Sequence, residues 1–294
     1  MDYTAVFVAA SEQDNPELLL LQALEKAGHK ATGQPRRLGR KAAEMSLALK
    51  DDLLGDVRKR LENLPGDAAL LPSLNRRKTL LICDMDSTII EQECLDELAD
   101  FAGLKDEISA ITERAMAGEL DFEAALTERV AMLKGLSVSA IDECYRTRIR
   151  LSEGARTLVA TMTKNGARCL LVSGGFTAFT SRVAKAAGFH EHHANILLDD
   201  GTVMTGKVGM PILGREAKLT TLVDAASEAG LSASDALAMG DGANDLAMID
   251  AAGLGIAYRA KPVVSAAADA AIDRGDLTTA LFFQGYSEEE FVSP

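Results

Sequence analysis

The sequence predicts an α/β protein in which a doubly wound parallel sheet carries an inserted helical cap and follows a small α+β unit. From residue 79 onward, short apolar runs alternate with helical patterns, which is typical of a parallel sheet covered by helices on both faces. An almost continuous helical pattern over residues 93–150 is longer than one crossover needs and indicates an insertion. The polar stretch 72–78 is the best candidate for a linker.

The first 75 residues are predicted to form a separate small domain. Their order of elements is βαββαβ, which is typical of a ferredoxin-like α+β sandwich. The first helix is the clearest, because an amphipathic pattern ends at Gly28. The predicted strands cover residues 4–10, 31–38, 44–49 and 68–71, and the predicted helices cover residues 16–27 and 52–64.

Residues 76–294 are predicted to form the second domain, with the helical cap at about 94–150. A β-hairpin is expected over residues 195–208, with its turn at 199–201. The predicted strands of the parallel sheet are residues 79–83, 168–172, 236–239 and 254–258.

Composition limits the classes of partner. The chain of 294 residues is 47% hydrophobic and 26% charged, as in ordinary globular proteins, and its net charge of −13 disfavours nucleic acid and anionic membranes. An anionic substrate would therefore need a strong local positive charge. The four cysteines form no C-x-x-C pair, which predicts free thiols and a cytoplasmic protein. A homodimer is left open.

Polar loops follow three of the predicted strands. Asp84 and Asp86 come after the first strand, residues 173–175 (SGG) after the second, and Asp241 and Asp245 after the third. Parallel sheets bind ligands at the carboxyl ends of their strands, so we expect the four carboxylates to converge. Their mutual repulsion requires a cation, and oxygen ligands without His or Cys favour Mg²⁺.

These motifs resemble the haloacid dehalogenase-like phosphatases. The resemblance runs from about residue 78 to the end of the chain and rests on D-x-D-x-T, S-G-G, a lysine and G-D-G-x-N-D in that order. It implies that Asp84 is the nucleophile and forms an aspartyl-phosphate, while Asp86 acts as general acid and then general base. It also implies that Mg²⁺ binds the carboxylates of Asp84 and Asp241 and the backbone carbonyl of Asp86.

The same resemblance assigns the groups that hold the phosphate. Ser173, the backbone amide of Gly174 and Lys218 would bind the phosphoryl oxygens, where charge spreads in the transition state. Asn244 is assigned to substrate binding beside them. Asp245 would orient Lys218 or a metal-bound water.

Within this superfamily the sequence most resembles the phosphoserine phosphatases. The resemblance rests on Glu93, Met116, Phe122 and Arg129 in the cap. It implies that Glu93 pairs with the ammonium of O-phosphoserine and that Arg129 grips its carboxylate. Met116 and Phe122 would cover the site and exclude water. The implied reaction is the last step of L-serine biosynthesis.

Other interpretations remain open at this point. The same chemistry would suit another small phosphomonoester, such as phosphothreonine, or phosphoryl transfer to an acceptor alcohol. The N-terminal unit also resembles the amino-acid-binding ACT domains, so a non-catalytic sensor is a further reading. His190, His192 and His193 lack metal-ligand spacing and are expected in a solvated loop.

Overall fold

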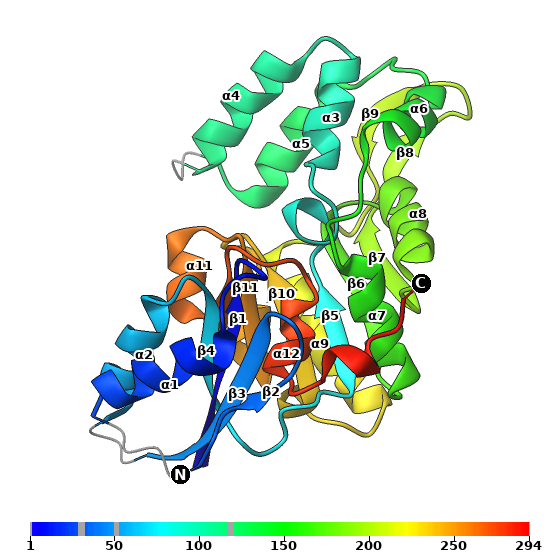
Figure 1. The fold of residues 1–294 in the computed structure, drawn as a ribbon. Coiled ribbons are helices and arrows are strands. Elements are labelled where there is room, and N and C mark those ends of the chain that lie inside the picture. Colours follow the sequence, from blue (N-terminus) through cyan, green and yellow to red (C-terminus); the bar gives the residue numbers. More distant parts are fainter. Residues whose placement is uncertain (1, 29–32, 50–52, 117–119, 294) are drawn as a thin grey trace.

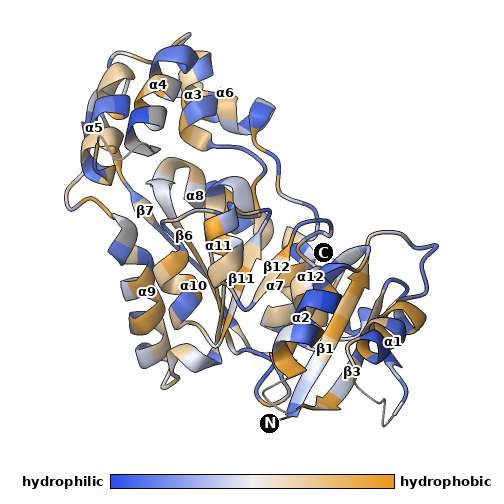
Figure 2. Cartoon of the chain, turned by 90° about the vertical axis from the view of Figure 1, so that its left-hand side faces the viewer, coloured by the Kyte–Doolittle hydropathy of each residue, from blue (hydrophilic) through white to orange (hydrophobic). Residues whose placement is uncertain are grey.

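A computed structural model describes the chain except residues 1, 29–32, 50–52, 117–119 and 294. Figure 1 shows three parts: an N-terminal sheet with two helices, a central sheet between helices, and a helical cap at the far end. Figure 2 shows helices that are apolar on one side and polar on the other. No described helix has the length and apolarity needed to cross a membrane.

The central sheet confirms the predicted α/β class. All its neighbouring strands are parallel, in the order β12-β11-β10-β5-β6-β7. The four predicted strands are present, and the short edge strands β7 and β12 are additional. The bounds are β5 Leu80–Cys83, β6 Arg168–Phe176, β7 Glu191–Asn195, β10 Ala236–Gly240, β11 Leu254–Tyr258 and β12 Ala270–Ile272.

Alternate side chains of each strand enter two different cores, which explains why the strands are continuous apolar runs. Leu81 and Cys83 belong to the core with α7 and α8, whereas Leu80 and Ile82 belong to the core with α9 and α10. The helices around the sheet are α7 Ala155–Lys164, α8 Thr177–Ala187, α9 Arg215–Glu228, α10 Leu246–Ala251, α11 Pro262–Ala267 and α12 Thr279–Phe283.

Two predictions about β6 and its neighbour are wrong. Residues 173–175 do not form a separate loop but belong to the irregular end of β6, where the register shifts between Val172 and Phe176. His192 and His193 lie in β7, paired with Leu171 and Val172, and not in a solvated loop. An edge strand needs pairing on one side only, so polar residues hide it from sequence patterns.

The N-terminal unit has the predicted βαββαβ order, and its antiparallel sheet has the order β2-β3-β1-β4. The predicted strand at 31–38 is reduced to Arg36–Arg37, and its first residues lie outside the described part. The predicted helix start at residue 52 is also outside it. The bounds are β1 Asp2–Ala9, α1 Pro16–Lys26, β2 Arg36–Arg37, β3 Ala42–Ala48, α2 Leu54–Glu62 and β4 Gly66–Pro72.

One face of this N-terminal sheet packs on α1 and α2, and the other packs on the rest of the chain. Val6, Val8 and Leu71 belong to the same hydrophobic core as α12. Asp67, only 5% exposed, accepts backbone hydrogen bonds from Asp273 (3.0 Å), Arg274 (3.1 Å) and Gly275 (2.7 Å). The division into domains at residues 75 and 76 stays a prediction.

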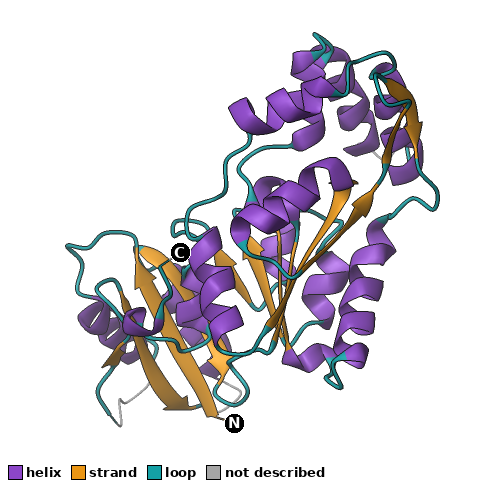
Figure 3. Ribbon diagram, turned by 90° about the vertical axis from the view of Figure 1, so that its right-hand side faces the viewer, coloured by secondary structure: helices purple, strands orange, loops and turns teal. Residues whose placement is uncertain are grey.

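The described part of the cap contains four helices, and the predicted hairpin packs beside them. The hairpin packs against α5, and its residue Met204 exchanges backbone hydrogen bonds with Gly135 (2.9 Å) and Leu136 (2.8 Å) of the cap. Figure 3 shows this hairpin beside the cap helices. The bounds are α3 Cys94–Phe101, α4 Lys105–Met116, α5 Phe122–Met132, α6 Ser139–Arg148, β8 Leu197–Asp199 and β9 Met204–Val208.

We predict that Asp67→Ala destabilises the protein by about 1–3 kcal/mol, because it leaves three backbone N–H groups of residues 273–275 without the acceptor that they have in the fold. Urea unfolding measures this change. Asp224→Ala, which removes an exposed carboxylate from the middle of α9, is the matched control. Equal unfolding midpoints for the two variants would show that Asp67 does not tie the two units together.

Candidate active site

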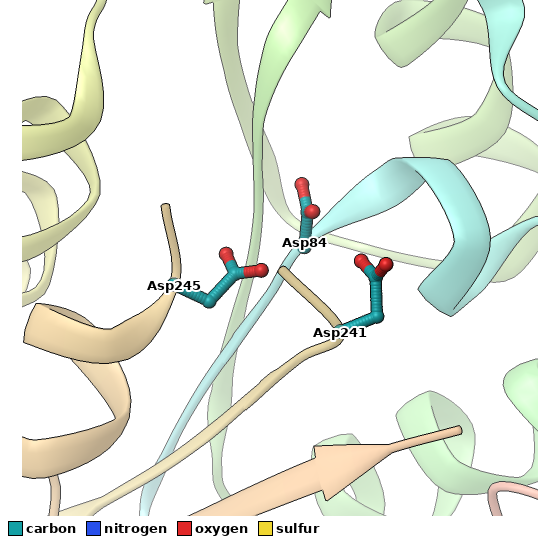
Figure 4. A group of neighbouring side chains, drawn as sticks. All are labelled: Asp84, Asp241 and Asp245. Carbon is teal, nitrogen blue, oxygen red and sulfur yellow. The ribbon is translucent and has the colours of Figure 1, made fainter. Parts of the chain in front are cut away.

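Three carboxylates meet at the carboxyl edge of the central sheet. Asp84 directly follows β5, Asp241 follows β10, and Asp245 precedes α10. Each offers an oxygen atom, and these oxygens lie within 4.8 Å of one another. Figure 4 shows the three side chains next to one another, with the carboxyl group of Asp245 directed toward the other two. Asp84 and Asp245 are buried, so the cluster requires a compensating positive charge.

Lys218 of α9 supplies part of this charge. Its Nζ lies 2.7 Å from Asp84 Oδ1 and 2.6 Å from Asp245 Oδ1. Asp245 Oδ2 also accepts a hydrogen bond from the backbone N–H of Gly242 at 3.0 Å. Burial alone would lower the pKa of Lys218, but the two aspartates outweigh it and hold that pKa above its usual value. Lys218 is therefore charged and fixed.

Gly240 makes room for this arrangement. A Cβ atom at position 240 would lie 2.3 Å from Cγ of Asp245, which no side chain tolerates. The last residue of β10 must therefore be glycine for Asp245 to reach Lys218.

The side chain of Asp86 is hydrogen-bonded outside the group of three carboxylates. Its Oδ1 accepts a hydrogen bond from the backbone N–H of Cys94 at 2.8 Å, and its Oδ2 accepts one from Ser173 Oγ at 3.0 Å. Ser87 beside it has a left-handed backbone with φ of 53°. The sequence predicted four converging carboxylates, but the side chain of Asp86 is not in the cluster. Burial raises the pKa of Asp86 despite these two hydrogen bonds.

The end of β6 lies between Asp86 and the cap. Ser173, buried and bonded to Asp86, also accepts a hydrogen bond from the N–H of Gly175 at 2.8 Å. The ring of Phe122 from α5 covers Gly174, because a Cβ atom there would lie 3.1 Å from Phe122 Cζ. The sequence placed Phe122 over the site, and the structure places it beside Gly174. Asn244 is half-buried, with its Oδ1 close over Gly242.

The sequence named two charged residues of the cap, Glu93 and Arg129, and both interact electrostatically with Asp86. Glu93 remains accessible to solvent and accepts a hydrogen bond from Ser87 Oγ at 2.7 Å. Loss of solvation among the neighbouring groups, and then the charge of Asp86, raise the pKa of Glu93 to about 7. Met116 ends α4, and its side chain lies outside the described part of the structure.

Arg129 makes no ion pair with any described carboxylate within salt-bridge distance. Its Nε donates to the carbonyl of Ala125 at 3.2 Å. Burial lowers the pKa of Arg129, and the charges of Asp96, Glu93 and Asp86 oppose that change. A half-buried guanidinium without a paired carboxylate is suited to an anionic ligand group. Sequence reasoning missed Asp96 as the nearby counter-charge.

Asn195 is a second residue that sequence reasoning missed. It is 1% exposed, and its Nδ2 donates to the carbonyls of Gly174 (2.8 Å) and Leu213 (3.3 Å). Its Oδ1 accepts from the N–H of Leu213 at 2.7 Å. A reversed amide would oppose oxygen to oxygen, so this orientation is fixed. Asn195 thus ties the end of β6 to the loop before α9. Its only sequence signal is a lone polar residue before three apolar residues, 196–198.

Comparisons with known proteins agree with this geometry. Residues 81–250 match the haloacid dehalogenase-like hydrolase family. The chain is 48% identical over 203 residues to a phosphoserine phosphatase of Polaromonas. The aligned region covers 67% of this chain and 86% of that protein.

Two solved structures are similar to the chain. A HAD family hydrolase of Salmonella enterica serovar Typhi has a TM-score of 0.87 at 30% identity, covering 96% of this chain and 98% of that one. A substrate-bound phosphoserine phosphatase has a TM-score of 0.66 at 35% identity, covering 70% of this chain and 98% of that one. Because the similarity to the Salmonella hydrolase covers 96% of this chain, it includes the N-terminal sheet.

We predict that Asn195→Asp loosens both segments that Asn195 joins, because a carboxylate cannot donate to the carbonyls of Gly174 and Leu213. The expected cost is about 1–3 kcal/mol of unfolding free energy, with faster amide hydrogen exchange at Gly175 and Leu213. Asn63→Asp, at the exposed end of α2, is the control. Unchanged exchange at both positions would show that Asn195 does not hold these segments.

Proposed function

The chain belongs to the haloacid dehalogenase-like hydrolases, and we propose on this basis that it hydrolyses O-phospho-L-serine to L-serine and inorganic phosphate. The main support is the way in which the two carboxylate oxygens of Asp84 are hydrogen-bonded. Its Oδ1 is occupied by Lys218 and by the N–H of Met85, whereas no described residue hydrogen-bonds its Oδ2. One oxygen is therefore positioned by the protein and the other is available to attack phosphorus.

In the first step, Asp84 Oδ2 forms a bond to phosphorus while the bond to the seryl oxygen breaks. Lys218 keeps the attacking carboxylate in place and faces the developing negative charge. In the second step water attacks the aspartyl-phosphate, and the carboxylate of Asp84 is released. Ser173, the N–H of Gly174 and Asn244 complete the proposed phosphate site.

Asp86 is the proposed general acid and base. Its two hydrogen bonds, from Cys94 N–H and Ser173 Oγ, fix its orientation. Because burial raises its pKa, Asp86 can carry a proton at higher pH than a solvated aspartate, and it gives this proton to the departing seryl oxygen. It then accepts a proton from the water of the second step.

Mg²⁺ is the proposed metal, held by the carboxylates of Asp84 and Asp241 and the backbone carbonyl of Asp86. The residues fit a hard cation, because the cluster offers only carboxylate oxygens. Burial and the charges of Asp245 and Asp86 raise the pKa of Asp84 well above its usual value, and burial raises that of Asp241 to about 6. When bound, the ion supplies the charge that keeps these carboxylates ionised.

The proposed substrate follows from the cap. Glu93 would pair with the substrate ammonium, and this cation would favour the ionised form of Glu93, whose pKa is about 7 without it. Arg129 would bind the substrate carboxylate. The relatives named phosphoserine phosphatase support this choice over phosphothreonine or an acceptor alcohol. A non-catalytic sensor would not need the network of Asp84 and Lys218. The four buried free cysteines suit the proposed cytoplasmic location.

We predict that Asp84→Asn abolishes turnover while the protein stays folded, because the amide is a poor nucleophile. Mass spectrometry of the rapidly quenched wild-type enzyme should locate the phosphoryl group on Asp84. Asp86→Asn should lose on the order of 10²–10⁴-fold in turnover and remain able to form the phosphoenzyme from an aryl phosphate. A phosphoryl group on any other residue contradicts the mechanism.

Arg129 provides the sharpest test of the substrate. We predict that Arg129→Ala costs about 2–4 kcal/mol in kcat/KM for phosphoserine, because the substrate carboxylate loses its partner. Arg129→Lys should also lose activity, since lysine keeps the charge but lacks the planar fork. Activity toward phosphoethanolamine, which has no carboxylate, should stay level or rise in Arg129→Ala.

Arg148→Ala is the control for Arg129, because Arg148 pairs with Glu97 and Asp100 on the outer surface of the cap. This variant should keep the preference of the wild type for phosphoserine over phosphoethanolamine. If Arg129→Ala lowers kcat/KM for both substrates by the same factor, Arg129 instead holds the cap or the phosphate. The phosphatase assignment would then stand without the phosphoserine assignment.

A further inference from the structure

A groove rich in arginine lies outside the catalytic site, between the cap and the core. Its volume is about 760 Å³, and it is lined by the end of α6, the chain that returns from the cap, the start of α7, and one side of α8. In Figure 1, α8 lies between α6 above it and α7 below it. We call this cavity the hinge groove. It is distinct from the catalytic centre, whose carboxylates are not among its lining residues.

The charge of the hinge groove opposes that of the whole protein. The chain has 44 acidic and 31 basic residues, yet the lining contains four arginines and one acidic residue, Asp142. Asp142 is already paired with Arg182. Arg150 donates to the carbonyls of Ile149 (2.8 Å) and Thr147 (3.2 Å). No described carboxylate forms an ion pair with Arg146, Arg150 or Arg156, although Asp276 Oδ1 lies close to Gly154 at the start of α7.

The backbone adds to this positive potential. Helix α7 begins at the groove after Gly154, has no side-chain cap and has no acidic residue in its first turn. The N-terminus of a helix carries a partial positive charge. Guanidinium groups bind phosphate and carboxylate oxygens through paired hydrogen bonds. The side chains and the helix therefore favour the same kind of ligand, an anion with several oxygens.

The hinge groove also spans the connection between cap and core. Arg146 belongs to the cap helix α6, whereas Arg156 and Arg182 belong to the core helices α7 and α8. Both chain crossings run side by side here, because Ile90 pairs with Leu151 in an antiparallel bridge. A ligand that contacts Arg146 and Arg156 together would join cap and core across their hinge.

We propose that the hinge groove is a regulatory site for a small polyanion of the phosphate-bearing class, and that its ligand restrains the movement of the cap. The volume lies in the range of small-molecule sites. A polyanionic macromolecule is disfavoured, because the net charge of −13 repels it outside the groove. The regulatory part of this proposal rests on the proposed phosphatase function, because movement of the cap would gate that reaction. Binding of the ligand in the groove does not depend on the proposed function.

Binding is tested with inorganic pyrophosphate by calorimetry on the full chain in metal-free buffer, and variants of the groove arginines identify the heat that comes from the hinge groove. Wild type should bind it at one site. Arg146→Gln and Arg156→Gln should each weaken binding by at least about ten-fold, since each removes a charge-assisted hydrogen-bond donor. Both side chains are exposed, so these variants should keep the unfolding midpoint and the basal turnover of wild type.

The matched control is Arg58→Gln/Arg60→Gln, which removes two exposed arginines from α2. This variant should bind pyrophosphate as wild type does. Failure of wild type to bind pyrophosphate at millimolar concentration overturns the site. Equal weakening in the control and the groove variants also overturns it, because binding would then follow net charge alone.

The regulatory part has its own measurement. Pyrophosphate should slow amide hydrogen exchange over residues 149–152 in wild type and leave it unchanged in the double variant Arg146→Gln/Arg156→Gln. Binding without any change at these hinge residues overturns the coupling to the cap. Loss of phosphoserine as a substrate would overturn the proposed function but would leave the binding result intact.

Discussion

The structure around the catalytic edge depends on one buried ion network, in which Lys218 lies between Asp84 and Asp245. Carboxylates within 4.8 Å of one another in a buried site repel strongly, so they persist only with fixed positive charge. The lysine comes from α9 and the aspartates follow β5 and β10. The network therefore sets how α9 packs on the sheet, and it requires glycine at position 240.

A second set of contacts brings the cap to this network. Phe122 lies over Gly174, and Asp86 is held between the N–H of Cys94, where the cap begins, and Ser173 of the sheet. The proposed acid is thus oriented by one donor on each side of the cap boundary. Opening of the cap would disturb residues of the proposed phosphate site, which would link substrate enclosure to proton transfer.

Charge is distributed unevenly over the molecule. The chain carries a net charge of −13, but the catalytic centre has the buried Lys218, and the cap has Arg129, which forms no ion pair with a described carboxylate. Positive charge inside an acidic protein attracts small anions locally while the surface repels large ones. The same reasoning applies to the hinge groove, where arginines outnumber acidic residues. Local placement, and not net charge, therefore decides which ligands are favoured.

The sequence by itself determined the α/β class, the central strands and the segments that carry Asp84, Ser173 and Asp241, because these features follow from local periodicity and from motifs at strand ends. It missed the edge strands β7, which is mostly polar, and β12, which has only three residues. Only the tertiary structure decided that the side chain of Asp86 bonds to Ser173 outside the carboxylate cluster and that Asn195 ties Gly174 to Leu213. It also decided between the two partners that the sequence allowed for Asp245, because Lys218 contacts it directly. The physical reason is distance along the chain. Such partners are 18 to 87 residues apart, so their meeting depends on how the helices and loops pack and not on any local pattern.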